Sequence, residues 1–355
     1  MDIFNSKLYP AVDYGAGVFL LLIAILSIMG NLLVLVMAYK RSSHMKPPEL
    51  LSVNLAVTDL GAAISMYPLA VASSWNHAWL GGNITCIYYG LMGFFFGTAS
   101  VATLTVMAIV RFCVSLSLQS PKEKISKKKV HVLLAGTWLY ALLWAVFPLL
   151  GWGRYGPEPF GLSCTLAWAE MKEHSPSFVI IMFSMNLVIP ALIIFSCYFG
   201  IFLRLYVSYK TIDNGNVIPN TVKMQRRLMV IAILISFGFL GCWTPYGIVS
   251  LWSIYFSSAS IPPHISMLPC LFAKTSTVYN PLIYYTFSKT FKREVKQLLH
   301  FCRRSETFNG SQPNNGTENT IYLVCKKNML MEGQSREHSF EKSIDIDSRF
   351  SKGHL

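Results

Sequence analysis

Charged residues are scarce in this sequence. Only 13% of its 355 residues are Asp, Glu, Lys or Arg, whereas such residues make up about 25% of an ordinary soluble domain. This low share disfavours a soluble enzyme. Acidic residues are the scarcer kind, 17 against 30 basic residues, so the formal net charge is +13. In a soluble protein that excess would indicate a nucleic-acid partner, so its meaning depends on where the basic residues lie.

Long apolar runs take the place of the missing charges. Apolar residues make up 53% of the chain, and about 20 in succession are enough to cross a bilayer as a helix. Seven runs reach that length: residues 14–39, 50–72, 85–110, 130–150, 178–203, 228–256 and 265–287. Buried helices of a soluble protein would need runs only about half as long. The sequence therefore predicts an all-α membrane protein, a seven-transmembrane helix bundle over residues 14–288.

The basic residues are unevenly distributed between the connections. If the amino-terminal residues 1–13 are extracellular, the cytoplasmic connections up to Arg304 contain 20 Lys and Arg residues, and the outer segments contain only Lys7, Arg154 and Lys172. Cytoplasmic loops are rich in Lys and Arg, so this orientation in the plasma membrane is the predicted one. The excess of basic residues therefore indicates the orientation of the spans in the membrane and contact with membrane lipid, and we expect no nucleic-acid partner.

Two of the eight cysteines face the outside in this topology. Cys86, at the outer end of the third span, and Cys164, between the fourth and fifth spans, are therefore predicted to form a disulfide. On the cytoplasmic side, residues 289–302 predict a short amphipathic eighth helix on the membrane surface, and Cys302 at its end is either a palmitoylation site or a plain thiol. Residues 303–355 lack apolar periodicity and predict a disordered tail, either a kinase substrate or solvated filler.

Two ionisable residues, Asp59 and Lys274, lie well inside the predicted spans, where a charge costs a few kcal/mol. Asp59 has Asn31 and Asn280 at a similar depth, and the three side chains predict a network of hydrogen bonds and water that suits a sodium ion. Lys274 lies six residues, about 9 Å, closer to the outside than Asn280. We expect it near the bottom of an outward-facing pocket.

Lys274 carries the candidate chemistry. A buried lysine shifts toward its neutral, nucleophilic form, which condenses with an aldehyde to a Schiff base. A lysine that extends to the membrane surface, or one paired with Asp59, fits this depth less well. Glu158, in the loop six residues before Cys164, is the outward-facing candidate for the anion that a protonated Schiff base needs.

Aromatic and small residues of the third and sixth spans are expected around the same pocket, and they suit a long polyene. In isolation, aromatic residues at helical spacing would indicate core packing or a membrane belt, and two glycines four residues apart would indicate helix contacts. The residues expected to line the pocket are Tyr89, Phe94, Gly97, Thr98, Phe239, Trp243 and Tyr246.

A set of motifs in fixed order resembles the signature of rhodopsin-like G-protein-coupled receptors, and Lys274 within it resembles an opsin. The loop from Pro157 to Leu166, the run from Gly93 to Gly97 and the run from Ala273 to Pro281 are most similar to the neuropsin group. The motifs of the signature are Gly30-Asn31, Asn54 to Asp59, Cys86, Arg111, Trp138, Cys164, Pro190, Cys242 to Tyr246, Lys274 and Asn280-Pro281-x-x-Tyr284.

This resemblance implies that 11-cis or all-trans retinal is bound covalently to Lys274 and that light isomerises it. The sixth span would turn about Trp243 and open a cytoplasmic cleft for a heterotrimeric G protein, and a receptor kinase and arrestin would act on the tail. The protein would be a light-sensing receptor and not an enzyme. Two alternatives stay open: a retinal photoisomerase of the retinochrome type with little or no signalling, and a receptor for a diffusible ligand.

The sequence departs from the family pattern at the expected counterion. Tyr89 occupies the third-span position that holds a carboxylate in vertebrate visual opsins. Glu158 lies at the loop position that many other opsins use, so it is the candidate counterion. Because Tyr89 is neutral unless ionised, a deprotonated, ultraviolet-absorbing Schiff base is compatible with this arrangement, and neuropsins often absorb in the ultraviolet.

A second departure concerns signalling. The family's acidic residue before Arg111 is Val110 here, and the sixth-span acid that would restrain this arginine is Gln225. We therefore hypothesise a dark state with basal signalling. The family's other switch residues are retained, and they are Asn280, Pro281 and Tyr284.

Overall fold

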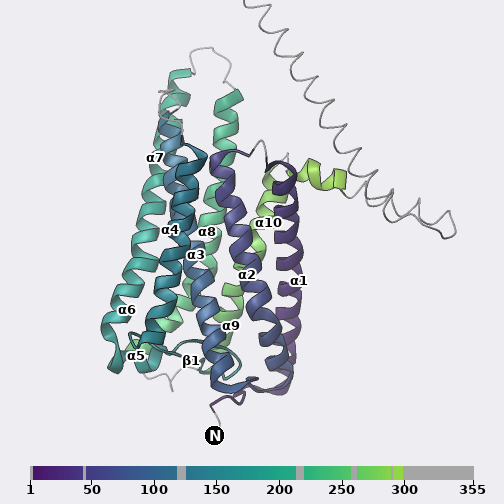
Figure 1. The fold of residues 1–355 in the computed structure, drawn as a ribbon, viewed down its shortest axis with the longest axis vertical. Helices are drawn as coiled ribbons and strands as arrows, with labels where there is room; N and C mark the ends of the chain where they lie inside the picture. Colours follow the sequence, from purple (N-terminus) through teal and green to yellow (C-terminus); the bar gives the residue numbers. More distant parts are fainter. Residues whose placement is uncertain are drawn as a thin grey trace, which may run out of the picture. The chain divides into compact units, whose positions relative to one another are not determined.

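The computed structural model describes residues 3–42, 45–117, 125–212, 220–256, 262–288 and 291–298. These residues are mostly helical, and the long helices pack side by side as a bundle (Figure 1). The first four spans are α1 (Pro10–Lys40), α2 (Pro47–Trp75), α3 (Gly82–Ser117) and α4 (Lys127–Val146), which continues into the 3-10 turn η2 (Phe147–Leu150). Helices cover the seven predicted apolar runs except at Thr275 and Phe256, so the predicted fold class is confirmed.

The remaining elements complete the bundle and its outer end. They are the strands β1 (Tyr155–Pro157) and β2 (Cys164–Leu166), then α5 (Trp168–His174), α6 (Pro176–Phe183), η3 (Ser184–Val188), α7 (Ile189–Ile212), α8 (Asn220–Tyr255), α9 (Pro263–Lys274) and α10 (Ser276–Phe287). Residues 291–298, within the predicted eighth helix, are also helical. The rest of that helix, with Cys302, and the predicted tail lie outside the described residues.

The fifth span contains an irregular turn that the apolar pattern does not predict. It consists of α6, η3 and α7, and η3 is a π-helical turn in which the Ile189 N–H donates to the Ser184 carbonyl. Pro190 follows directly and has no N–H, so it cannot donate to the carbonyl of Asn186 four residues before it. Wide turns of this kind inside helices are frequent at functional sites.

The seventh span is also interrupted. Six helices of the described chain are long and apolar enough to cross a membrane, whereas the seventh apolar run is divided at Thr275 into the two short helices α9 and α10. At the break the Val278 N–H donates to the Thr275 carbonyl at 3.0 Å. The Lys274 carbonyl instead accepts from the Tyr67 hydroxyl of α2 at 3.0 Å. The helix therefore bends directly after Lys274 without leaving this carbonyl unpaired.

A short β-hairpin covers the outer end of the bundle. Strands β1 and β2 pair antiparallel, with Tyr155 opposite Leu166. The predicted disulfide between Cys86 and Cys164 is present and joins β2 to the start of α3. A Cβ atom on Gly90 would lie 3.3 Å from the Thr165 backbone, so this glycine lets the hairpin lie close against α3.

The N-terminal strap, residues 3–8, holds the hairpin in place. The Lys7 N–H donates to the Phe160 carbonyl of the hairpin at 3.2 Å, and the Ser6 N–H donates to the His77 carbonyl at 3.0 Å. Gly161 has a φ of +86°, and a side chain there would collide with the Asn5 carbonyl. The strap therefore lies between the α2–α3 connection and the tip of the hairpin.

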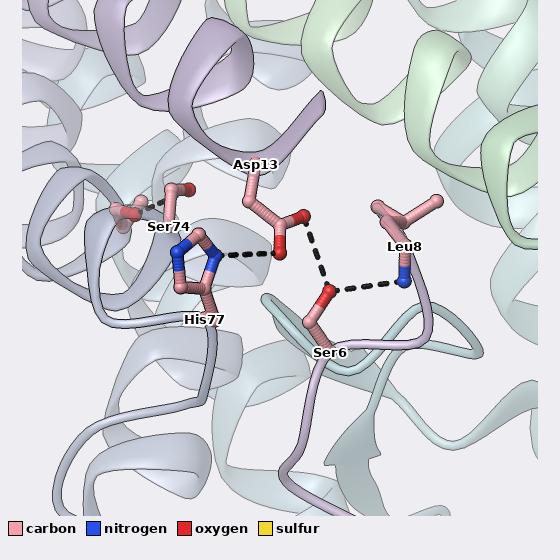
Figure 2. Close-up of polar contacts among 6 residues, drawn as sticks. Ser6, Leu8, Asp13, Ser74 and His77 are labelled. Carbon is pink, nitrogen blue, oxygen red and sulfur yellow. Dashed lines mark hydrogen bonds and ion pairs between the residues drawn. The ribbon is translucent and has the colours of Figure 1, made fainter. Parts of the chain in front are cut away.

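A buried carboxylate fixes this strap, as Figure 2 shows. Asp13 of α1 is fully buried. Its Oδ1 accepts from the Ser6 hydroxyl at 3.1 Å, and its Oδ2 lies 3.1 Å from Nδ1 of His77. The Ser6 hydroxyl in turn accepts from the Leu8 N–H at 3.1 Å. One side chain thus joins the strap, α1 and the α2–α3 connection.

We expect Asp13→Ala to lower the free energy of unfolding by about 1–3 kcal/mol, because it leaves Ser6 and His77 without their buried partner. Thermal unfolding of the purified protein measures this loss, and amide exchange at Ser6 should be faster in the variant. The control is Arg154→Ala, which breaks an ion pair whose two side chains are 74% and 54% exposed and should cost at most about 0.5 kcal/mol. Equal losses in the two variants would contradict the role of Asp13.

Candidate functional site

One cavity inside the bundle contains the residues that the sequence singled out. Its volume is about 280 Å³, and its walls come from α2, α3, the hairpin, α5, α6, η3, α8, α9 and α10. This is just below the range of about 300–1,000 Å³ that is usual for small-molecule sites. All residues predicted for the pocket line it, namely Tyr89, Phe94, Gly97, Thr98, Glu158, Phe239, Trp243, Tyr246 and Lys274. Residues from distant parts of the chain therefore meet in one mainly apolar space.

Lys274 is the last residue of α9 and lines the cavity. The Nζ atom lies 3.3 Å from the Cys270 Sγ and 5.5 Å from the ring centroid of Tyr89. In the described part of the chain, no carboxylate oxygen lies within 4.0 Å of this amine. Asp59 accepts from the Asn280 amide at 2.7 Å instead. The alternative of a Lys274–Asp59 salt bridge is therefore wrong.

Glu158 lies at the tip of the hairpin and is buried in the same cavity. Its backbone N–H donates to the Ser163 carbonyl at 2.8 Å, which turns the side chain inward. The Tyr246 hydroxyl of α8 donates to the Glu158 Oε1 at 2.7 Å and itself accepts from the Trp168 Nε1–H at 3.3 Å. The carboxylate is therefore held by Tyr246 of α8, and its oxygens lie more than 4.0 Å from the Lys274 Nζ.

Burial raises the pKa of Glu158 from its ordinary value of 4.5 to about 7. The hydrogen bond from Tyr246 and the charge of Lys274 act in the opposite direction and favour the charged form. Because the resulting pKa lies near neutrality, a small change around this carboxyl is enough to alter its charge.

An aromatic column on α8 forms another wall of the cavity. The rings of Phe239 and Trp243 have centroids 5.8 Å apart, and those of Trp243 and Tyr246 are 5.9 Å apart. The Trp243 Nε1–H donates to the Ser276 hydroxyl of α10 at 3.3 Å. A Cβ atom on Gly97 would lie 3.7 Å from the Trp243 ring, so the glycine of α3 leaves room for this indole. Trp243 thus connects three spans.

Sequence reasoning missed several cavity residues. Cys270 lies four residues before Lys274 and so shares its helix face, a signal that was present in the sequence. Trp168 comes from α5, a short helix of the outer loop, and no pattern in the sequence indicates its hydrogen bond to Tyr246. Asn186 lies in the π-helical turn η3, which the apolar run conceals.

Among the three residues predicted for a sodium and water network, Asp59 and Asn280 are hydrogen-bonded to each other, as described above. The Asn31 amide donates to the Thr277 carbonyl at 2.9 Å. Pro281 cannot donate to that carbonyl because it has no N–H. Ser27 also contacts the same carbonyl, at 3.5 Å. Asn31 therefore satisfies the backbone of the seventh span.

The cytoplasmic switch residues are less constrained. Val110 is buried, and the Arg111 Nε is buried without a hydrogen-bond partner in the described structure. The hydroxyls of Tyr198 and Tyr284 interact with the Arg111 charge electrostatically, but the Tyr284 hydroxyl also lacks a hydrogen-bond partner there. The side chain of Gln225 lies outside the described residues.

The stability of the ligand-free protein should fall between about pH 5 and pH 7 through Glu158. In this window the unfolded chain has lost the carboxyl proton, whereas the folded protein, with its pKa of about 7, retains it. Raising the pH therefore favours the unfolded state. Glu158→Gln should remove this part of the pH dependence, as measured by thermal unfolding at a series of pH values.

The matched control for this measurement is Glu170→Gln, because Glu170 lies in α5 of the same loop but is exposed and pairs with Arg154. Its stability curve should follow that of the unchanged protein. A Glu158→Gln curve that follows the unchanged protein as well would refute the raised pKa.

Comparisons with known proteins agree with the fold. The family described as "7 transmembrane receptor (rhodopsin family)" matches residues 30–284. Human Opsin-5 is 36% identical over 293 residues, which cover 82% of each chain. The human visual pigment-like receptor peropsin is 30% identical over 289 residues, which are 81% of this chain and 85% of that one. The crystal structure of squid rhodopsin superposes with a TM-score of 0.76 at 26% identity and covers 88% of this chain and 89% of that chain.

Proposed function

The chain belongs to the rhodopsin family of seven-transmembrane receptors and is an opsin similar to the neuropsin group, and from this premise we propose that it senses light through retinal bound covalently to Lys274 and signals to a heterotrimeric G protein. The observation that carries the proposal is a primary amine in a mainly apolar cavity that is also lined by two buried carboxyl groups, Glu158 and Asp59, of which Asp59 is bonded to Asn280. A polyene aldehyde needs both an apolar space and an amine.

The residues present fit such a group. Retinal held as a Schiff base on Lys274 would supply the absorption of light and the change of shape that follows. The apolar walls from α3, η3 and α8 exclude water from the amine. Cys270 and Tyr89 are the neighbours of that amine, at 3.3 Å from its Nζ to the sulfur and 5.5 Å to the ring, and they restrict where it points.

Glu158 is the proposed counterion. It is not in contact with Lys274, so it acts through the low-dielectric cavity, where a charge is felt over longer distances than in water. Tyr246 fixes the carboxylate by the 2.7 Å hydrogen bond. With a pKa of about 7, Glu158 supplies a full negative charge only in part of the molecules at neutral pH. This supports a Schiff base that changes its protonation near neutrality and absorbs in the ultraviolet when deprotonated.

Trp243 is proposed to pass a movement in the cavity to the cytoplasmic side. It packs on Phe239 of the same helix and donates to Ser276 of α10. A displacement of the indole would therefore move α8 and α10 together. At the other end Arg111 has no ion pair in the described chain. The receptor is therefore proposed to have basal activity in the dark.

The remaining proposals follow from topology. The amino terminus faces the outside of the plasma membrane, as the positive-inside rule requires. Cys302 carries a palmitoyl group and contacts lipid, and a receptor kinase and arrestin bind the tail. The second candidate function is a retinal photoisomerase of the retinochrome type. The absence of an ion pair on Arg111 in the described chain favours it, because a protein that does not signal has no need of an acidic residue that restrains this arginine.

The purified protein should gain an absorbance band when it is incubated with 11-cis or all-trans retinal, and light should shift that band. Lys274→Ala should abolish it, because no other amine lines the cavity among the described residues. The control, Lys7→Ala in the N-terminal strap, should keep the band. A band that persists in Lys274→Ala would refute the attachment site, and a protein without any band would indicate a receptor for a diffusible ligand.

Light should raise GTP exchange on a purified heterotrimeric G protein, and Val110→Glu should lower the exchange seen in the dark, since a carboxylate next to Arg111 restores the missing restraint. Val110→Gln is the matched control, with the same size and no charge. Equal dark exchange in the two variants would refute basal activity. Light that changes the retinal isomer without any change in exchange would establish the photoisomerase instead.

A further inference from the structure

We propose that Asn186 is a binding site for a hydroxyl group on the ring end of the chromophore, so that the pocket selects a ring-hydroxylated retinal over unsubstituted retinal. This inference rests on the proposed function, because it takes one end of the ligand to be held at Lys274. The inference goes further than the proposed function because it names the chemical group that the cavity wall at η3 recognises.

The π-helical turn η3 places Asn186 in the cavity wall. Asn186 is the central residue of the turn Ser184–Val188, and its side chain lines the cavity together with Phe183 and Leu187. A wide turn displaces its side chains from the positions that a regular helix would give them. The turn directly precedes Pro190, which has no N–H to donate to the Asn186 carbonyl. The place of this irregular turn in the span is therefore tied to the position of the proline in the sequence.

The amide of Asn186 presents an oxygen that has no partner. Its Nδ2 donates to the Met182 carbonyl at 3.2 Å, and only the nitrogen of an amide is able to donate to a carbonyl. The orientation of the group is therefore determined, and the Oδ1 is the free atom. This oxygen is buried and has no hydrogen-bond partner in the described structure.

Asn186 and Lys274 belong to different walls of the cavity. The turn η3 packs against α3, α6 and α7, whereas α9 packs against α8, α1 and α10. The proposal takes a rigid chain tethered to Lys274 to extend its free end to the wall that contains η3. Phe183 and Leu187, which line the cavity from the same part of the chain, are apolar, so neither side chain supplies a donor to the free Oδ1.

Such an acceptor discriminates between ligands by their ability to donate. Away from its aldehyde, unsubstituted retinal has only carbon and hydrogen and leaves the Oδ1 unpaired. A hydroxyl on the ring donates one hydrogen bond and satisfies it. Sites that are built to bond a hydroxyl reject the analogue that lacks it, because a buried polar group is then left without a partner.

The test is a competition for the full-length purified protein. Retinal and 3-hydroxyretinal are offered in equal amounts, the bound fraction is released by denaturation, and the two are separated by chromatography. The unchanged protein should take up 3-hydroxyretinal in about tenfold excess, the ratio that one hydrogen bond of ordinary strength provides. Asn186→Leu should bring the ratio near one, and Asn186→Ser, which retains an oxygen acceptor, should keep part of the excess.

The control variant is Leu187→Ala, which changes the adjacent wall but leaves the amide, and it should keep the excess. An equal uptake of both compounds by the unchanged protein overturns the inference, and it would indicate that the Asn186 oxygen is satisfied by water. This result decides the question even if the Asn186 variants do not fold. If both compounds form pigment and are bound in a ratio of one, only this inference is refuted. If neither compound forms pigment, the proposed function is refuted as well.

Discussion

The hydrogen bonding of the backbone inside a bilayer is the constraint on which this structure depends. No water is available there, so each carbonyl that loses its helical donor needs another one. The carbonyl of Thr277, freed by Pro281, accepts from Asn31 of α1, and the carbonyl of Lys274, freed by the break at Thr275, accepts from Tyr67 of α2. The same two bonds attach the seventh span to the rest of the bundle, and they fix the point from which the Lys274 amine enters the cavity.

A second constraint acts at the outer end of the molecule, where a buried carboxyl group lines a mainly apolar cavity. The disulfide to Cys164 anchors one strand of the hairpin, and the N-terminal strap holds its tip through the Phe160 carbonyl. Within this frame Glu158 reaches Tyr246. The cost of burial appears in its pKa of about 7, and the distance from Lys274 keeps the two groups from forming a direct ion pair.

The sequence predicted much of this arrangement, and there are physical reasons why it could not predict the rest. Apolar run length fixed the seven spans, because the bilayer thickness sets it directly. The pocket residues were found because Lys274 marks a depth that other spans share. The bond from the Asn31 amide to the Thr277 carbonyl was not predicted. This bond depends on how closely α1 approaches Pro281, because a Cβ atom on Gly30 would lie 2.9 Å from the Pro281 Cβ. No pattern within one span reports such an approach.

The sequence by itself thus determined the class of protein, the orientation predicted for the membrane, the disulfide and the lysine on which the proposed chemistry depends. These follow from properties that are local or summed along the chain: apolar length, charge on each side, and the rarity of an ionisable residue within a span. Only the tertiary structure decided which groups face that lysine. The neighbours of its amine are Cys270 and Tyr89, Glu158 bonds to Tyr246, and the Asn186 oxygen is left free. Hydrogen-bond partners are chosen by distances between separate spans, and those distances are set by packing.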